Sequence, residues 1–315
     1  MQRKIDLIIK EVGKAIVGKD MCIKKVMMAV LAQGHVLIED IPGVGKTTLA
    51  LAFAKAMGLQ QNRVQFTPDV LPSDITGFSS YDKETGNFLY HEGAVMCNVL
   101  LADEINRTSA KTQSALLEVM EEYAVTVDGV NRPVPQPFFV IATENPVGAA
   151  GTQMLPESQL DRFLICIVMG YLEKEDEKSI LKDWERKGIL EDINGVITEQ
   201  ELMDMQEKVK TIYIHDRIMD YIIELSDATR NHEQIQLGLS TRGSIAVAKM
   251  ARAAAYVAGR RFVIPEDVRE VFPDVARHRL KMAHQTRMKQ VSTEQVIQEI
   301  LNQVRMPRPE DKYEK

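Results

Sequence analysis

The chain is poor in the residues that build disulfide frameworks and zinc sites. Among its 315 residues there are only three cysteines, and they are Cys22, Cys97 and Cys166. Thiols that are odd in number and far apart in the sequence suit reduced core residues better than cross-links or metal ligands. We therefore expect a cytoplasmic protein without a disulfide framework.

Long apolar runs and an excess of positive charge are also missing. No stretch approaches the roughly 20 apolar residues that span a bilayer. Near the N-terminus, Ile5, Ile8 and Val12 recur at helical spacing and do not form the continuous apolar core of a signal peptide. The formal net charge of −6 has the wrong sign for a surface that binds nucleic acid or anionic lipid. We expect neither membrane insertion nor a nucleic acid partner.

Apolar residues make up 45% of the 315 residues, which is enough for a large core divided between two domains. Strand-like and helical stretches alternate up to Val168, and the composition then changes. We expect an α/β domain over residues 1–171, an all-α domain over residues 172–305 and a disordered tail over residues 306–315. The second domain shows no further strand pattern, and its helices are expected at Glu199–Lys210, Asp216–Thr229, Ser244–Ala258 and Pro265–His278.

The stretch HVLIEDIPGVGKTTL, residues 35–49, predicts a phosphate-binding loop. His35–Ile38 is an apolar run typical of a buried strand, and helix formers resume over Thr47–Met57. In the loop between them, backbone N–H groups and the helix dipole would converge on one point. Lys46 would reach the β- and γ-phosphates, and the Thr47 hydroxyl would ligate Mg²⁺. The residues assigned to the site are Asp40, Pro42, Gly43, Val44, Gly45, Lys46, Thr47 and Thr48.

One residue departs from the usual G-x-x-x-x-G-K-[ST] pattern, which has a glycine where this chain has Asp40. A carboxylate beside phosphates is unfavourable unless it points away, so Asp40 bears on nucleotide affinity. The alternative interpretation is an ordinary glycine-rich turn that binds nothing. The [NT]-K-x-D tetrad that selects guanine is absent, which argues against a GTPase.

A second chemically informative stretch is NVLLADEINR, residues 98–107. Val99–Ala102 predicts a buried strand with Asp103 and Glu104 at its carboxyl end, where open α/β sheets bind their ligands. In ATP hydrolysis the first acid can hold Mg²⁺ and the second can polarise the attacking water. The alternative is a pair of solvated loop acids.

Two further polar residues lie next to expected strands. Asn145 follows the strand expected at Phe138–Ala142, and Arg162 precedes the strand expected at Leu164–Val168. Asn145 could hydrogen-bond a γ-phosphate, but the local sequence alone favours an Asn-Pro turn. Taken alone, Arg162 would be interpreted as an exposed residue in a salt bridge.

Two β-hairpins are expected between these strands. The first covers Tyr81–His91, with its turn at residues 85–87. In the second, Val125–Val127 is followed by Asp128 and Gly129, the Asp-Gly pair that two-residue hairpin loops prefer.

The segments IEDIPGVGKT, LLADEINR, AKTQSALLEVMEE, ATENP and LPESQLDRFL occur in this order. In sequence and spacing they closely resemble the MoxR family of AAA+ ATPases, and the resemblance runs from about Gly18 to Leu280. It implies a P-loop core with a parallel sheet, a C-terminal helical lid, and ATP and Mg²⁺ as cofactors. The implied roles are Walker A for Lys46 and Thr47, Walker B for Asp103 and Glu104, first sensor for Asn145, arginine finger toward a neighbouring subunit for Arg162, and nucleotide-touching second sensor for Arg242.

The same resemblance implies a homo-oligomeric ring, expected to be a hexamer, which remodels or matures client proteins. Such proteins often work with a partner that carries a von Willebrand factor A domain, and the two hairpins would face the pore or a partner. For Arg242 the alternative is a helix-start arginine paired with an acid. Two other classes of function stay open. One is a DNA-remodelling or loading ATPase, which the acidic balance disfavours, and the other is a nucleotide-gated scaffold with little turnover.

Overall fold

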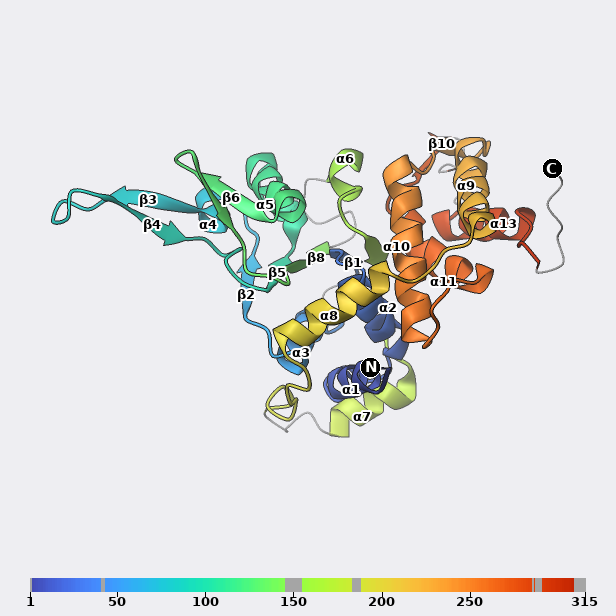
Figure 1. Ribbon diagram of the computed structural model, residues 1–315, viewed down its shortest axis with the longest axis horizontal. Coiled ribbons are helices and arrows are strands. Elements are labelled where there is room, and N and C mark those ends of the chain that lie inside the picture. Colours follow the sequence, from blue (N-terminus) through green and yellow to red (C-terminus); the bar gives the residue numbers. More distant parts are fainter. Residues whose placement is uncertain are drawn as a thin grey trace.

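The computed structural model describes residues 2–40, 43–144, 155–182, 188–284, 286 and 291–308. A five-stranded parallel sheet, with strand order β2-β5-β8-β1-β9, forms the centre of the protein (Figure 1). Its strands are β1 (Val36–Glu39), β2 (Gln61–Gln65), β5 (Val99–Asp103), β8 (Phe139–Glu144) and β9 (Ile165–Ile167). The four strands other than β2 are apolar runs because helices cover both faces of the sheet. The predicted α/β class is confirmed.

Alternate residues of each strand face two different apolar layers, as the two-residue period of a strand requires. On β1, Val36 and Ile38 belong to the layer that contains α1, α2 and α3, whereas Leu37 belongs to the layer that contains α5. The helices of this core are α1 (Gln2–Gly13), α2 (Asp20–Leu31), α3 (Lys46–Ala56), α4 (Pro72–Thr76), the 3₁₀ turn η1 (Ile105–Arg107), α5 (Ala110–Glu122) and α6 (Glu157–Leu160).

Both predicted hairpins are present, and the hairpin of β3 (Gly77–Tyr81) and β4 (Phe88–Glu92) extends far from the body of the protein (Figure 1). Its first arm ends at Tyr81, where the sequence analysis expected that arm to begin. The second hairpin pairs β6 (Ala124–Val127) with β7 (Val130–Pro133). In the second turn, Asp128 and Gly129 both have positive φ, 54° and 74°. This is the conformation that an Asp-Gly pair tolerates in a two-residue hairpin loop.

The C-terminal part is largely helical, as predicted. Its helices are α7 (Lys174–Lys182), α8 (Glu199–Lys210), α9 (Asp216–Arg230), α10 (Thr241–Val257), α11 (Pro265–Ala276) and α13 (Thr293–Gln303). The expectation that no strand recurs here is wrong, because Ile235–Leu237 (β10) and Lys281–Met282 (β11) form a short antiparallel pair. Strands of two or three residues are too short to produce a periodic pattern that sequence reasoning could detect.

The apolar layer that covers one face of the sheet continues into the C-terminal helices. Residues of α8, α9, α10 and α11 belong to the same buried cluster as α1, α2 and α3. Gln206 on α8 donates a hydrogen bond across 2.8 Å to the carbonyl of Val30 on α2. The domain boundary near residue 172 therefore stays a prediction, and most of the expected disordered tail lies outside the described residues.

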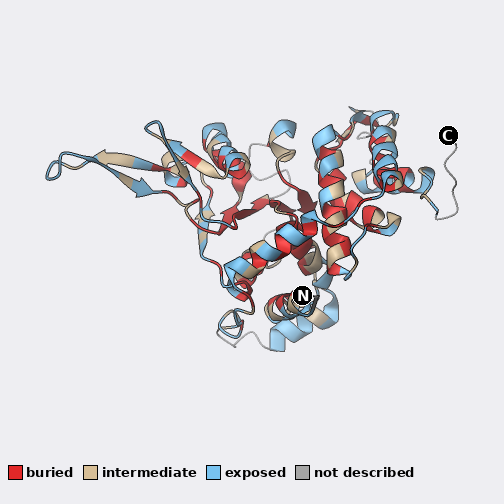
Figure 2. Ribbon diagram, viewed as in Figure 1, coloured by how far each residue is buried: buried red, intermediate tan, exposed pale blue. Residues whose placement is uncertain are grey.

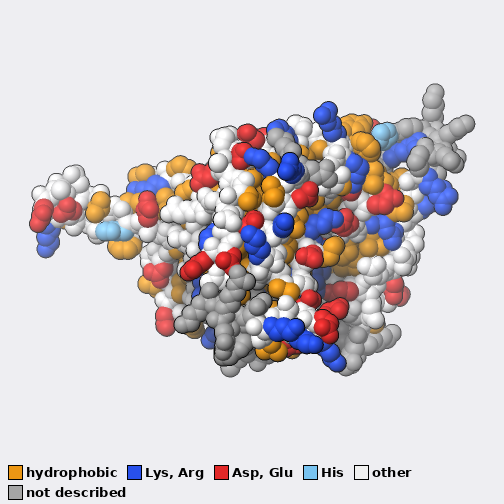
Figure 3. Space-filling model, turned by 90° about the horizontal axis from the view of Figure 1, so that it is seen from below, with side chains coloured by type: hydrophobic (Ala, Val, Ile, Leu, Met, Phe, Trp, Pro, Cys, Tyr) orange, Lys and Arg blue, Asp and Glu red, His pale blue; other side chains and the backbone are white. Residues whose placement is uncertain are grey.

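Burial is concentrated in the sheet and in the helix faces turned toward it, whereas α7 and the hairpins are mostly exposed (Figure 2). On the face seen in Figure 3, acidic and basic side chains are interspersed. Within the described part of the chain, none of the helices is both long enough and apolar enough to cross a bilayer.

Candidate functional site

The carboxyl ends of the parallel strands bring the predicted phosphate loop and the predicted acids together. Thr47, in the first turn of α3, donates its hydroxyl to Asp103 Oδ2 across 3.2 Å. Thr143, near the end of β8, donates to the other oxygen, Asp103 Oδ1, across 2.9 Å. A hydroxyl and a carboxylate side by side are hard oxygen ligands of the kind that Mg²⁺ prefers. The pair Thr47 and Asp103 therefore fits the predicted magnesium site, with the remaining ligands left to phosphate and water.

Lys46 is held at the start of α3 with its ammonium group inside the loop. Its Nζ donates to the backbone carbonyl of Asp40 across 2.6 Å, and the residue is only 7% exposed. Burial lowers the pKa of Lys46, while the negative charges of Asp40, Asp103 and Glu104 act in the opposite direction. A largely desolvated ammonium ion surrounded by backbone gains strongly when an anion enters the loop.

Glycine is required at the turn that presents this lysine. Gly43 and Gly45 have φ of 88° and 90°, in the left-handed region that favours glycine. Gly45 is the residue that caps α3, so Lys46 is the first residue of the helix. Gly43, Val44, Gly45 and Thr48 also line a neighbouring pocket. Pro42 lies outside the described residues.

Asp40 does not contradict phosphate binding, because its carboxylate has another partner. The side chain is buried, and its Oδ2 accepts a hydrogen bond from the backbone N–H of Gly170 across 2.5 Å. Gly170 follows β9, the edge strand beside β1. The carboxylate thus connects the start of the loop to the segment after the neighbouring strand, a role that a glycine at position 40 could not fill.

Glu104 has a strained backbone conformation, with φ of 55° and ψ of 50°. Its backbone N–H donates to the Thr143 hydroxyl across 2.9 Å. Its Oε2 accepts hydrogen bonds from Gln65 Nε2 at 2.9 Å and from Arg107 at 2.7 Å. A non-glycine residue in this region is a feature that the surrounding structure must enforce, and such residues cluster at functional sites. Here it directs a carboxylate away from the end of β5 toward neighbouring donors.

The sequence analysis did not identify the donors around the two acids. Arg63 on β2 contacts Asp103 Oδ2 with its Nε at 3.0 Å and a terminal nitrogen at 2.7 Å. Arg63 and Gln65 are alternate residues of β2, and Gln65 lies opposite Asp103 in the strand register. A polar residue at every second position of a strand that pairs with β5 was the available signal.

Arg162 and Arg242 lie together on one carboxylate. Arg162 contacts Glu121 Oε2 at 3.1 Å, and Arg242 donates to Glu121 Oε1. Glu121 is near the end of α5, Arg162 precedes β9, and Arg242 lies in the first turn of α10. The interpretation of Arg242 as a helix-start arginine paired with an acid matches this contact, which leaves its predicted contact with nucleotide untested.

This arginine pair lies at the edge of the sheet opposite the phosphate loop. The imidazole Nε2 of His35, just before β1, contacts the carbonyl of Met120 at 3.0 Å. The backbone carbonyl of His35 accepts a hydrogen bond from the N–H of Leu164 at 2.8 Å. Met120 is next to Glu121, and Leu164 follows Arg162 by two residues. The loop, in contrast, begins where β1 ends, four residues later. At about 3.3 Å per residue, the two edges are roughly 13 Å apart along β1.

Asn145 lies outside the described residues, so its predicted role stays a prediction. The strand before it, β8, ends at Glu144 on the same edge as the phosphate loop. Glu144 lies opposite Glu39 in the register of β8 and β1. Burial, and then the charge of Glu39, raise the pKa of Glu144 to about 7.

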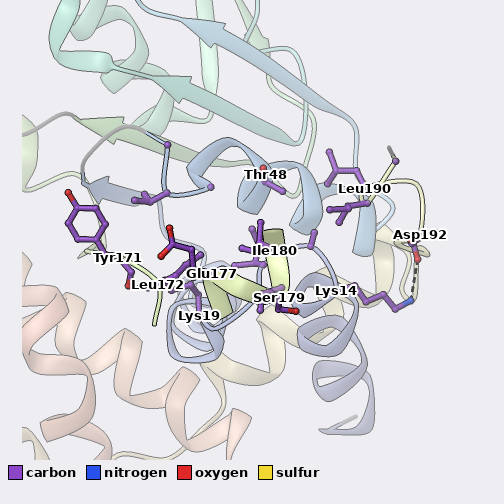
Figure 4. A pocket seen from close by; sticks show the side chains of 18 of the residues that line it. Lys14, Lys19, Thr48, Tyr171, Leu172, Glu177, Ser179, Ile180, Leu190 and Asp192 are labelled. Atoms are coloured by element: carbon purple, nitrogen blue, oxygen red, sulfur yellow. Dashed lines mark hydrogen bonds between the residues drawn. The ribbon is translucent and has the colours of Figure 1, made fainter. Parts of the chain in front are cut away.

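A pocket of about 1120 Å³ opens beside the phosphate loop (Figure 4). Its wall is formed by the segment between α1 and α2, the loop itself, the segment after β9, α7 and residues 188–192. Lys19 Nζ fixes one side through the carbonyl of Tyr171 at 2.7 Å, and Lys14 Nζ fixes another through the carbonyl of Asp192 at 3.2 Å. A pocket of this size with apolar walls is typical of small-molecule sites.

Comparisons with known proteins agree with this geometry. The model of the "ATPase family associated with various cellular activities (AAA)" matches residues 35–165, and the "AAA lid domain" model matches residues 227–300. The chain is 45% identical to the uncharacterized protein YeaC of Bacillus subtilis (strain 168), over 95% of this chain and 93% of that protein. It is 40% identical to the chaperone MoxR1 of Mycobacterium tuberculosis (strain ATCC 25618 / H37Rv), over 94% and 81%. A crystal structure from Cytophaga hutchinsonii superposes with a TM-score of 0.89 at 36% identity, covering 98% of this chain and 96% of the other.

Proposed function

The chain belongs to the MoxR family of AAA ATPases, and from this premise we propose that it hydrolyses Mg²⁺-ATP at sites shared between subunits of a ring. We further propose that the ATPase cycle remodels or matures client proteins. The observation that carries the proposal is the separation of the functional groups between two edges of one sheet. The phosphate loop and the acids lie at the carboxyl edge, and Arg162 lies at the amino edge.

Each group at the carboxyl edge has a distinct task in this proposal. Lys46 binds the β- and γ-phosphates, and Thr47 and Asp103 would hold a magnesium ion, which would supply positive charge beside the transferred phosphate. Glu104 orients and polarises the attacking water. The carboxylate is available for this once it leaves Gln65 and Arg107, its partners in the present structure.

The charge that develops on the γ-phosphate needs a further cation, and that cation comes from a neighbouring subunit. Arg162 cannot reach its own phosphate loop across the sheet, whereas a ring places the amino edge of one subunit against the carboxyl edge of the next. Arg242 shares Glu121 with Arg162 and therefore faces the same neighbour. An arginine supplied in this way is worth about 10³–10⁵ in kcat in other nucleotide hydrolases.

The pocket beside the loop holds the base and ribose of the nucleotide in this proposal. Gly43, Val44 and Thr48 belong both to the phosphate loop and to the pocket wall, so a nucleotide can occupy the two at once. The absence of the guanine-selecting tetrad favours adenine.

Action on client proteins is supported by the relative that is named a chaperone. The chain also offers surfaces for such contacts, because Phe78, Tyr81, Phe88 and Leu89 on the first hairpin are all exposed. A hexameric assembly, a partner with a von Willebrand factor A domain and a cytoplasmic location are part of the same proposal. The three free thiols are compatible with a reducing compartment.

The first experiment measures Mg²⁺-ATP turnover per subunit as a function of protein concentration, with the oligomeric state recorded in parallel by mass photometry. We expect turnover per subunit to rise steeply over the concentrations at which the oligomer assembles, and Lys46→Ala to be inactive at all of them. A constant turnover in a demonstrated monomer would overturn the shared site. ATP binding without turnover in the assembled oligomer would favour a nucleotide-gated scaffold.

A further inference from the structure

Arg279 is a buried arginine in the segment Arg277–Leu280, which resembles the family's helical lid but for which the sequence indicated no individual role. It lies just after α11, in the C-terminal helical part, and its side chain is only 4% exposed. Its Nε donates to Asp161 Oδ1 across 2.6 Å, and its terminal nitrogens donate to the carbonyls of Phe163 at 2.6 Å, Leu164 at 3.1 Å and Asp161 at 3.2 Å. A fifth bond of 2.6 Å goes to the carbonyl of Val275, near the end of α11.

The carbonyl groups that accept these bonds belong to residues on both sides of Arg162 in the sequence. The guanidinium group of Arg279 binds the backbone on both sides of Arg162, and His278 contacts the carbonyl of Phe163 at 3.1 Å. Only an arginine offers this planar fork of donors, because a lysine ammonium cannot reach a carboxylate and several carbonyls in fixed directions. The backbone that carries Arg162 is therefore attached to the end of α11.

A second helix of the C-terminal part is attached to the same segment. Asp161, which accepts from Arg279, also accepts through Oδ2 from the hydroxyl of Ser240 across 3.1 Å. Ser240 caps α10, and Arg242 lies two residues further along. The two arginines that share Glu121 are therefore connected twice, through Glu121 itself and through the carboxylate of Asp161.

We propose that Arg279 is a positioning residue for Arg162. It fixes the segment 161–164 to the end of α11, and Asp161 in that segment is in turn bonded to Ser240, the cap of α10. Arg162, Arg242 and the C-terminal helices then move as one body against the neighbouring subunit. A change of nucleotide in the neighbour's site, which Arg162 contacts, would then move the C-terminal helices of this subunit directly. The inference rests on the proposed function, because Arg162 needs a precise position only if it serves a shared ATP site.

The test begins with Arg279→Lys, which keeps the buried charge and removes the fork of donors. Since a misplacement of about 1 Å can cost about 10²-fold in rate, we expect kcat to fall by about 10- to 100-fold with little change in KM. The double variant R162A/R279K should be no slower than R162A alone, because a positioning residue has no effect once its target is absent. A further loss of activity in the double variant would overturn the proposal.

The matched control is Lys281→Gln. Lys281 pairs with Glu157 at 2.5 Å and so joins the same two parts of the chain, but both side chains are well exposed. Glu157 contacts the segment 161–164 through its backbone carbonyl, which accepts the N–H of Asp161 at 3.1 Å, and this variant leaves that bond in place. It removes only the exposed side-chain pair, so we expect it to keep the kcat of the unchanged protein. An equal loss of kcat in K281Q and R279K would mean that any loosened contact between these parts is sufficient, which contradicts a specific role for Arg279.

Mixed rings separate positioning from a general defect. Subunits with Glu104→Gln lack a working site but donate Arg162, and subunits with Arg162→Ala have an intact site but donate no arginine, so mixing the two should restore activity. Adding R279K to the Glu104→Gln subunits should lower the restored activity by the same factor of about 10 to 100, whereas adding it to the Arg162→Ala subunits should leave the restored activity unchanged. The proposal would be overturned if R279K lowered the restored activity when it is placed in the Arg162→Ala subunits and not when it is placed in the Glu104→Gln subunits.

The melting temperature of R279K and the activity of Arg162→Ala alone distinguish a folding defect, a failure of the shared site and a failure of the positioning role. If R279K does not fold, as judged by its melting temperature, Asp161→Asn replaces it, because that variant weakens the same contact from the other side. Full activity of Arg162→Ala alone would refute the shared site itself, whereas an inactive Arg162→Ala with fully active R279K and Asp161→Asn would refute only the positioning role.

Discussion

Gln65 Nε2 donates a hydrogen bond to Glu104 Oε2 across 2.9 Å, at the point where β2 and β5 end side by side. Arg107 donates to the same oxygen at 2.7 Å. A carboxylate oxygen that already accepts from two donors has less capacity left to accept a hydrogen bond from a water molecule. In this arrangement the residue proposed to polarise water is restrained in the absence of nucleotide, and its restraint comes from the edge strand of the sheet.

We therefore expect Gln65→Leu, which keeps the size of the side chain and removes the donor, to raise basal ATP turnover. A hydrogen bond to a charged group is worth about 1.5–3 kcal/mol, but Arg107 still donates to the same oxygen, so the expected gain is only severalfold. Steady-state turnover without a client or partner is the measurement. The double variant with Glu104→Gln should be inactive, which assigns the gain to Glu104. A lower basal rate in Gln65→Leu would instead mean that Gln65 orients Glu104 for catalysis.

Substitutions of Arg162 and of Lys46 should affect different quantities, the first ATP turnover and the second ATP binding. Arg162→Ala is expected to lower kcat by about 10³-fold or more, because a cation that stabilises the transition state is lost. Its affinity for a fluorescent ATP analogue should remain close to that of the unchanged protein, because the phosphate loop is intact. Lys46→Ala should lose most of the affinity itself. Weak nucleotide binding in Arg162→Ala would contradict a role limited to the neighbouring subunit's transition state.

Sequence reasoning recovered the elements of the core because the signals for them are local. The apolar run before the glycine loop became β1, and Asp103 and Glu104 appeared at the end of β5 as expected. The Asp-Gly turn of the second hairpin has the backbone conformation that these residues favour. The parallel sheet was implied by the family resemblance, and it agrees with the alternation of strands and helices up to Val168.

The contacts that the sequence did not reveal depend on packing between distant segments. Nothing near Asp40 indicates that its carboxylate binds the N–H of Gly170, which is 130 residues away. Likewise, Arg279 follows an ordinary amphipathic helix, and its role becomes visible only where that helix meets the segment before β9. The strands β10 and β11 form by pairing with each other and carry no pattern of their own.

Asp40 provides a test of how the loop tolerates a carboxylate beside phosphate. Asp40→Asn keeps an oxygen that can accept from Gly170 and removes the negative charge, so we expect equal or tighter ATP binding, by up to about tenfold. Asp40→Ala removes the acceptor as well and leaves the Gly170 N–H without its partner. We expect this variant to have a lower melting temperature, by a few degrees.

Isothermal titration with a non-hydrolysable ATP analogue and thermal unfolding measure the two effects separately. Comparing Asn with Ala at position 40 isolates the hydrogen bond, and comparing Asn with the natural Asp isolates the charge. If Asp40→Asn bound the analogue much more weakly than the unchanged protein, the carboxylate would have to contact the nucleotide or its metal ion, and the contact with Gly170 would not be its main role.

The Glu144 carboxyl makes the stability of the nucleotide-free protein depend on pH near neutrality. Burial, and next the charge of Glu39, raise its pKa from 4.5 to about 7. Because the folded-state pKa is higher than the unfolded one, the folded protein favours the protonated form. The corresponding stability is fully present below about pH 4.5 and is lost as the pH rises through about 7.

Glu144→Gln resembles the protonated carboxyl and does not titrate, so it should remove this loss. We expect its melting temperature to exceed that of the unchanged protein by a few degrees at pH 8, and the difference to shrink steadily as the pH falls through 7 toward 5. Thermal unfolding over this pH range, without nucleotide, measures the effect, and Glu118→Gln on the exposed face of α5 is the control. A difference in melting temperature that stayed constant with pH would show that Gln improves packing, because only the ionisation of Glu144 between pH 5 and 8 can produce a difference that grows with pH.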